Sequence, residues 1–122
     1  MEKTLAGADV ILATLSSSVN SITEKYLVHG LATSKAVGAL RPVSVCIIDE
    51  ASQCVEPEAL IPLKYGFCKL VMVGDHEQLP ATVTSRRAQQ LDYQQSLFSR
   101  LISCMTATGG NTPVLRLDTQ YR

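Results

Sequence analysis

The sequence predicts an α/β fold in which helices flank a parallel sheet, and two features of the apolar residues lead to it. Short runs rich in β-branched residues are expected to be strands at residues 9–13, 43–48, 69–73 and 114–117. Their apolar character is continuous rather than alternating, which indicates strands covered on both faces. The stretches between them leave room for crossover helices, and functional loops are expected at the carboxyl ends of the strands.

Two helices are predicted from local signals. Residues 58–64 follow Pro57, and proline is favoured in the first turn of a helix. Residues 96–105 place their apolar side chains at helical spacing on one face. The breaker Gly109-Gly110 then separates this helix from the last expected strand. The 122 residues suit one domain or part of one.

Composition excludes several classes of protein. Hydrophobic residues make up 46% and charged residues 18%, which is typical of a globular chain. The 11 basic and 11 acidic side chains balance, but acidic residues gather in residues 43–80 and basic ones in 81–122. That distribution suits a metal–phosphate site beside an anion-binding surface. Because no apolar run approaches the roughly 20 residues of a membrane span and no signal peptide is evident, we expect an intracellular, reduced protein without a membrane partner.

Residues 45–53 (VCIIDEASQ) form the first chemical motif: an apolar strand that ends in two carboxylates followed by small residues. The strand would hold Asp49 and Glu50 at the sheet edge, with room for a phosphate tail. Asp49 is then suited to hold Mg²⁺, and Glu50 to deprotonate an attacking water. The alternative is that both acids merely stabilise the start of the next helix. A glycosidase pair is excluded, because its acids flank a bond from separate positions roughly 5–10 Å apart.

Residues 69–80 (KLVMVGDHEQLP) form the second motif, another apolar strand followed by a polar loop. Gln78 can sense a terminal phosphate by hydrogen bonding without adding charge, although a solvated loop glutamine is the alternative. His76 lies between two acidic residues, and we expect it to be solvated rather than to act as a general base.

These motifs together resemble those of superfamily 1 (SF1B) helicases, in the branch that contains senataxin and the nonsense-mediated-decay helicase. Residues 49–53 (DEASQ), 74–83 (GDHEQLPATV) and 117–122 (LDTQYR) resemble motifs II, III and the start of IV. Residues 8–18 resemble motif Ic, and residues 88–98 resemble the segment after motif III. The resemblance implies that residues 1–122 form part of the first RecA-like motor domain, a fold of the P-loop NTPase type.

The resemblance also implies the function and the site residues. The complete protein would couple hydrolysis of Mg-ATP to movement along single-stranded RNA or DNA and to unwinding of duplexes, typically 5′→3′. Asp49 would hold Mg²⁺ and Glu50 would activate the water. Gln78 and Arg122 would contact the γ-phosphate, and Gln53 would contribute to binding of the nucleotide.

For the nucleic-acid partner, the resemblance implies that Thr14 and Ser16 contact the backbone, where hydroxyl groups bind phosphates without reading sequence. A polar loop without this role is the alternative for the serine-rich stretch. Arg86 and Arg87 are candidates for additional electrostatic contact, or else an ordinary solvated pair. The resemblance to senataxin favours a nuclear over a cytoplasmic location, and leaves the oligomeric state open.

The sequence contains no G-x-x-x-x-G-K-[ST] motif, the P-loop that encloses nucleotide phosphates. We therefore expect an incomplete sheet that lacks the P-loop strand, and expect the P-loop segment and a second RecA-like domain to be structural partners. Residues 69–73 should pair with 43–48, residues 114–117 should lack a partner, and the isolated chain should be loosely folded and inactive. The alternatives are a non-catalytic nucleic-acid-binding or interaction fragment, or a transport or AAA-type motor. The QLP and QYR sequences argue against the motor.

Overall fold

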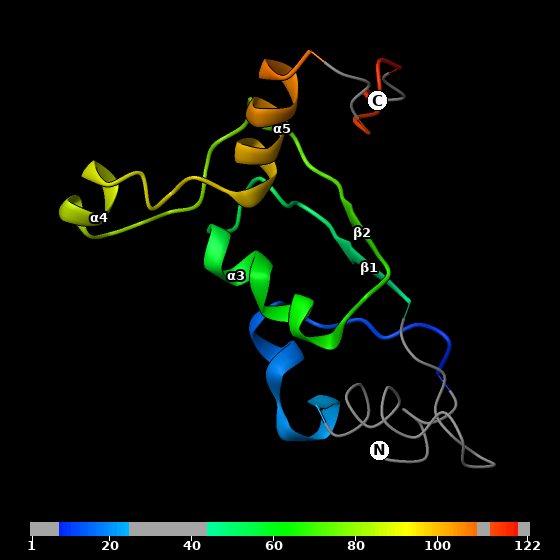
Figure 1. Ribbon diagram of the computed structural model, residues 1–122. Coiled ribbons are helices and arrows are strands. Elements are labelled where there is room, and N and C mark those ends of the chain that lie inside the picture. The colour runs from blue at the N-terminus through cyan, green and yellow to red at the C-terminus, as the bar shows by residue number, and fades with distance from the viewer. Residues whose placement is uncertain (1–7, 25–43, 110–112, 120–122) are drawn as a thin grey trace.

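The computed structural model describes residues 8–24, 44–109 and 113–119. Its two strands, β1 (Val45–Ile48) and β2 (Lys69–Met72), form a parallel two-stranded sheet (Figure 1). Val45 is paired with Lys69 and Ile48 with Met72. Strands are thus confirmed within the expected ranges 43–48 and 69–73, as is their pairing, although both are shorter than predicted and residue 43 lies outside the described residues.

A short helical crossover joins the two strands. Helix α3 (Glu56–Leu60) has Pro57 in its first turn and continues into a 3-10 helix, η2 (Ile61–Tyr65). The change of helix type coincides with Pro62, which has no N–H to donate and whose ring conflicts with the carbonyl four residues earlier. The helix predicted at residues 58–64 is therefore present, but it begins two residues earlier and is not α-helical throughout.

The longest helix in the described part of the chain is α5 (Leu97–Ala107). Its N-cap is Ser96, whose hydroxyl accepts a hydrogen bond of 3.1 Å from the backbone N–H of Ser99. The helix predicted at residues 96–105 is confirmed. Within the described ranges, no helix is long and apolar enough to cross a membrane.

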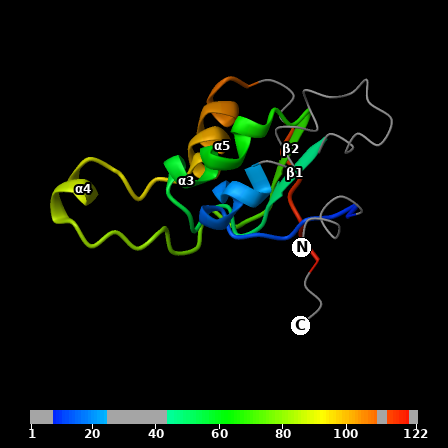
Figure 2. The same cartoon turned by 90° about the horizontal axis from the view of Figure 1, so that it is seen from below.

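The helices lie on one side of the sheet (Figures 1 and 2). The core lies between these two layers, and burial there raises the pKa of the Cys46 thiol. Its residues are Ile48, Ala51, Ala59 and Leu97, with the partly buried Cys46, Leu70, Met72, Phe98 and Leu101 packed against them.

The opposite face of the sheet is uncovered in the described structure. Ile47 is 67% exposed, Val71 37% and Val73 46%. The expectation that both faces of these strands are covered is therefore not met. The apolar character of this second face nevertheless agrees with a sheet that lacks part of its covering.

Two of the predicted strands are wrong. Residues 9–13 and 113–119 form no strand, and their large apolar side chains are exposed, as at Leu12 (93%) and Leu115 (86%). A strand needs a neighbour to which its backbone can bond, and among the described residues β1 and β2 pair only with each other. For residues 114–117, the lack of a partner was itself expected.

Residues 79–95, called the arm below, project away from the sheet and helices (Figures 1 and 2). The short helix α4 (Arg86–Gln90) lies at the tip of the arm. The arm leaves the loop after β2 and returns to the start of α5.

Candidate functional site

Asp49 and Glu50 lie directly after β1, in an exposed turn at the carboxyl edge of the sheet. Glu50 has φ of 50°, a left-handed conformation that residues other than glycine rarely adopt. Its N–H donates a hydrogen bond of 3.0 Å to Oδ1 of Asp49. Such a conformation costs on the order of 1–3 kcal/mol and is found preferentially at functional sites. The local backbone thus marks this turn as a candidate site.

Gln53 holds the Glu50 carboxylate from the following turn. The Gln53 N–H donates to the Glu50 carbonyl oxygen at 2.9 Å, and its side-chain Nε2 donates to Oε2 of Glu50 at 3.3 Å. The other carboxylate oxygen, Oε1, has no hydrogen-bond partner among the described residues. One oxygen of Glu50 is therefore oriented while the other remains available to accept a proton.

The loop after β2 packs directly on the turn after β1. The sheet ladder continues past the strands, because Val73 N–H donates to the Ile48 carbonyl at 2.9 Å and Ala51 N–H to the Val73 carbonyl at 2.8 Å. A Cβ at Gly74 would lie 3.1 Å from the backbone nitrogen of Ser52 and 3.2 Å from that of Ala51. Only glycine permits this approach without displacement of the backbone.

Ser52 lies at this junction and is only 3% exposed. Its hydroxyl oxygen has no hydrogen-bond partner within the described structure. Sequence reasoning included Ser52 only among the small residues that leave room for a phosphate tail, and it assigned no role to Gly74. For Gly74, the available signal was a glycine at the first position after an apolar strand.

Asp75 orders the loop that carries Gln78. Its Oδ1 accepts a hydrogen bond of 2.9 Å from Glu77 N–H, and its Oδ2 accepts one of 3.1 Å from Nε2 of Gln78. These two bonds, and to a smaller extent the neighbouring His76 and Arg116, lower the pKa of the Asp75 carboxyl. Sequence reasoning missed Asp75, although an aspartate that begins a polar loop is a common former of such turns.

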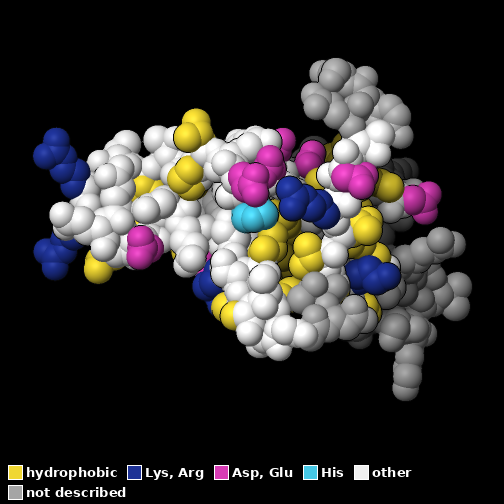
Figure 3. Space-filling view, turned by 90° about the horizontal axis from the view of Figure 1, so that it is seen from above, with side chains coloured by type: hydrophobic (Ala, Val, Ile, Leu, Met, Phe, Trp, Pro, Cys, Tyr) yellow, Lys and Arg dark blue, Asp and Glu magenta, His cyan; other side chains and the backbone are white. Residues whose placement is uncertain are grey.

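Gln53 and Gln78 line a shallow hollow of about 590 Å³, together with Glu77, Leu79, Pro80 and Thr82. Two of the residues predicted to serve the nucleotide are therefore brought together. Asp49 and Glu50 are not part of the lining, although the contacts at Gly74 place their turn against the same loop. Figure 3 shows acidic side chains gathered beside a histidine on one face of the molecule.

Asp49 was predicted to hold Mg²⁺. Its Oδ1 accepts the Glu50 N–H, whereas its Oδ2 has no hydrogen-bond partner in the described ranges. No group of three or more potential metal-ligating side chains occurs in that part of the chain. Mg²⁺ commonly binds one or two carboxylates and keeps its other positions for phosphate and water, so a single free carboxylate oxygen fits it.

Thr14 and Ser16 lie at a separate turn, the 3-10 helix η1 (Ser16–Val19). The Thr14 hydroxyl donates to the hydroxyl of Ser17 at 2.8 Å and accepts from its N–H at 3.2 Å, so it holds the turn together. Ser16 is exposed and its hydroxyl has no hydrogen bond to another described residue. The crossover α3–η2 connects the turn after β1 with η1 (Figure 1).

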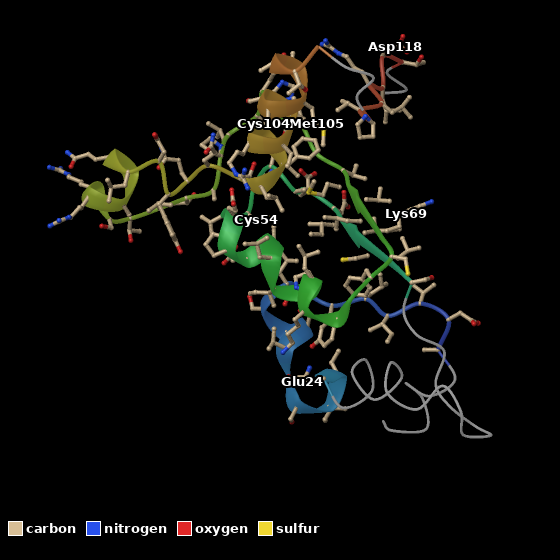
Figure 4. The ribbon with its side chains drawn as sticks, viewed as in Figure 1. Glu24, Cys54, Lys69, Cys104, Met105 and Asp118 are labelled. Carbon is tan, nitrogen blue, oxygen red and sulfur yellow. The ribbon has the colours of Figure 1, made fainter. Side chains whose placement is uncertain are left out.

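Two contacts attach η2 to η1 and the helical turn that follows it. The buried Tyr65 hydroxyl donates a hydrogen bond of 2.5 Å to the carbonyl oxygen of Ser18, and burial raises the pKa of Tyr65. Lys64 forms an ion pair of 2.9 Å with Glu24, which lies on the helical turn after η1 (Figure 4). Arg122, the remaining predicted site residue, lies outside the described residues.

Comparison with known proteins gives a consistent set of relatives. Residues 1–86 match the AAA_11 family model, whose description is AAA domain. The chain is 44% identical over 97 residues to Helicase sen1 of Schizosaccharomyces pombe, a match that covers 80% of this chain and 5% of that protein. Helicase SEN1 of Saccharomyces cerevisiae is 41% identical over 118 residues, which is 97% of this chain and 4% of that protein.

A third relative is the ATP-dependent helicase NAM7 of Saccharomyces cerevisiae. It is 45% identical over 76 residues, which is 62% of this chain and 7% of NAM7. The chain thus spans a tenth or less of the length of each of these three relatives.

Proposed function

Because the chain belongs to the AAA_11 family, and within it to the superfamily 1 helicases of the senataxin type, we propose that it supplies two catalytic loops of an ATP-dependent helicase. It would form part of the first RecA-like motor domain. The observation that carries the proposal is the backbone junction at Gly74, which joins the turn of Asp49 and Glu50 to the loop of Gln78. A water-activating acid and a phosphate sensor need to be held in such a fixed relation.

In the proposed reaction, water attacks the γ-phosphorus of ATP, the bond to the β–γ bridging oxygen breaks, and ADP and phosphate leave. The proton of the water passes to Oε1 of Glu50, while Gln53 holds Oε2. Gln78 would donate a hydrogen bond to the γ-phosphate, and Arg122 would add a guanidinium to the same group. Asp49 would hold Mg²⁺ through Oδ2, and the metal would neutralise charge on the phosphates.

The 122 residues contain no P-loop, so the backbone that encloses the phosphates would come from a segment other than this one, and a second RecA-like domain would complete the site. The uncovered apolar face of β1 and β2 is compatible with this arrangement.

Single-stranded RNA or DNA would be the second substrate. Since the hydroxyl of Thr14 is engaged within its own turn, Thr14 would position the turn and the exposed Ser16 would make the contact to the phosphate backbone. A nuclear location is part of the same proposal.

The test uses the complete protein that carries this chain. Glu50→Gln keeps the size of the side chain and removes its basicity, so steady-state ATP hydrolysis should fall on the order of a hundredfold or more while ATP still binds. Glu58→Gln, which removes an exposed acid of α3 outside the site, is the matched control and should hydrolyse ATP at the normal rate. Near-normal turnover by Glu50→Gln would contradict the proposal.

The isolated 122-residue chain gives a second test. Without a P-loop it should bind a fluorescent ATP analogue only weakly and show no measurable hydrolysis. Retention of nucleic-acid binding by a complete protein that hydrolyses no ATP would instead favour the non-catalytic alternative.

A further inference from the structure

The arm, residues 79–95, is folded at its tip by its own hydrogen bonds. Nε2 of Gln89 donates to the carbonyl of Val83 at 2.6 Å, and Tyr93 N–H donates to the carbonyl of Ala88 at 3.0 Å. Ser85 caps α4 by accepting from Ala88 N–H at 3.4 Å. The tip is therefore a defined structure that lies away from the sheet and the helices (Figures 1 and 2).

Two adjacent arginines, Arg86 and Arg87, begin the helix at this tip. Both are exposed, and neither forms an ion pair or a hydrogen bond with another described residue. Asp92 is the only acidic residue among residues 79–95. Arg86 lies in the first turn of this five-residue helix, where a cation opposes the helix dipole, and Arg87 also belongs to its last turn, where a cation is favoured, so the dipole gives the pair no net stabilisation. Helix stability therefore does not account for their presence.

The charge of the tip is opposite to that of the candidate site. Asp49, Glu50, Asp75 and Glu77 make the loops after β1 and β2 acidic. Figure 3 shows basic side chains at the far end of the projection, well apart from the acidic group. The acidic loops by themselves do not attract a nucleic-acid backbone, whereas the arginines at the tip of the arm do.

Large apolar side chains accompany the arginines. Leu91 is 75% exposed, and Tyr93 is 49% exposed. Basic groups and an exposed aromatic ring on one projecting segment are the combination that binds single strands without sequence preference, because the cations contact phosphates and bases stack on the ring.

We propose that the tip of the arm, through Arg86, Arg87 and Tyr93, is a binding surface for the phosphate backbone of a single-stranded nucleic acid. The inference rests on the proposed function, because the arm would bind the same single-stranded RNA or DNA. It adds a contact region that is distinct from the turn of Ser16. The arm begins at Leu79 and Pro80, which line the hollow beside Gln78, so the new surface is joined to the proposed phosphate sensor by continuous chain.

The test compares Arg86→Gln/Arg87→Gln with the unchanged complete protein, by fluorescence anisotropy of labelled oligo-uridylate over a range of salt concentrations. Loss of two phosphate contacts should weaken binding roughly tenfold at low salt and lower the slope of log K against log salt by about 1.4. Tyr93→Leu should weaken binding with little change of slope. Basal ATP hydrolysis without nucleic acid should be unchanged in all of these variants.

Lys69→Gln is the matched control, because Lys69 is an exposed cation on β2 that points away from the helices (Figure 4). It should leave both the affinity and the slope unchanged. Equal binding by the arginine variant and the unchanged protein would overturn the inference and leave the proposed function intact. The inference would also be wrong if nucleotide turnover fell while oligonucleotide affinity stayed the same, since the arm would then contact protein. An unchanged protein that bound no oligonucleotide would overturn both.

Discussion

Gly74 and Ser52 approach so closely that a Cβ at position 74 would lie 3.1 Å from the backbone nitrogen of Ser52 and 3.2 Å from its hydroxyl oxygen. Ser52 lies in the turn after β1 and Gly74 in the loop after β2, so the two residues are far apart in sequence. Their contact joins the two loops that carry the proposed catalytic side chains, and it depends on backbone atoms rather than on side-chain packing.

Gly74→Ala should push these loops apart. We expect a loss of stability of about 1–3 kcal/mol in the complete protein, because the added methyl group meets backbone that cannot rotate away. Thermal unfolding measures this loss, and nucleotide affinity should fall with it. Ser52→Ala is the informative comparison: it removes a buried hydroxyl without a described partner, so stability should be unchanged or slightly higher.

The double variant separates two explanations of the contact. Because the backbone nitrogens of Ala51 and Ser52 remain in place, Ser52→Ala should not rescue Gly74→Ala. Full rescue would mean that the hydroxyl, and not the backbone, restricts position 74.

Asp75→Ala should release Gln78 from its fixed orientation, since Oδ2 of Asp75 accepts the hydrogen bond from Nε2 of Gln78. A misplaced contact group can reduce a rate by roughly a hundredfold, and Gln78→Ala should give a similar loss of nucleic-acid-stimulated ATP hydrolysis. The two substitutions together should cost little more than either alone. Additive losses in this double-mutant cycle would show that Asp75 acts independently of Gln78. His76→Ala, a change on the same exposed loop, is the control and should be close to normal.

The ion pair between Glu56 and Arg100 should make stability dependent on pH. Arg100 donates from Nε to Oε2 at 2.6 Å and from Nη2 to Oε1 at 2.8 Å, which joins α3 to α5 and lowers the pKa of Glu56. Since this pKa is lower in the folded state, the stabilisation is complete at neutral pH and is lost as pH falls through the lowered value.

Thermal unfolding of the complete protein between pH 3 and 7 tests this dependence. Glu56→Gln should lower the midpoint at neutral pH and should flatten the acid limb of the curve. Glu56→Gln will not abolish the loss of stability in acid. The pKa of Asp75 is also lowered in the folded state, so its protonation destabilises the protein as pH falls as well. Glu58→Gln should keep the full dependence. Identical curves for Glu56→Gln and the unchanged protein would show that the pair has no net effect on stability.

The elements that could be predicted from the sequence are those whose signals are local. The apolar runs of β1 and β2 and the helical spacing of Leu97, Phe98 and Leu101 are contained in short windows. Residues 9–13 and 114–117 have similar composition, but a strand forms only where a partner is present, and that condition cannot be read from the run itself.

The residues of the candidate site could be predicted from the sequence, but their arrangement in space could not. Asp49, Glu50 and Gln78 followed from motif order, and they remain predictions as catalytic residues. The hydrogen bonds from Gln53 to Glu50 and from Gln78 to Asp75, and the junction at Gly74, depend on distances through space. The projection of the arm could not be predicted either, because nothing in the sequence of residues 79–95 indicates that they extend away from the sheet and helices.

The crossover α3–η2 has a mechanical consequence. It begins a few residues after Glu50, and Tyr65 at its other end is bonded to the carbonyl of Ser18. A displacement of the turn after β1 would therefore reach η1 through this continuous helical segment, whose helix type changes once, between Leu60 and Ile61.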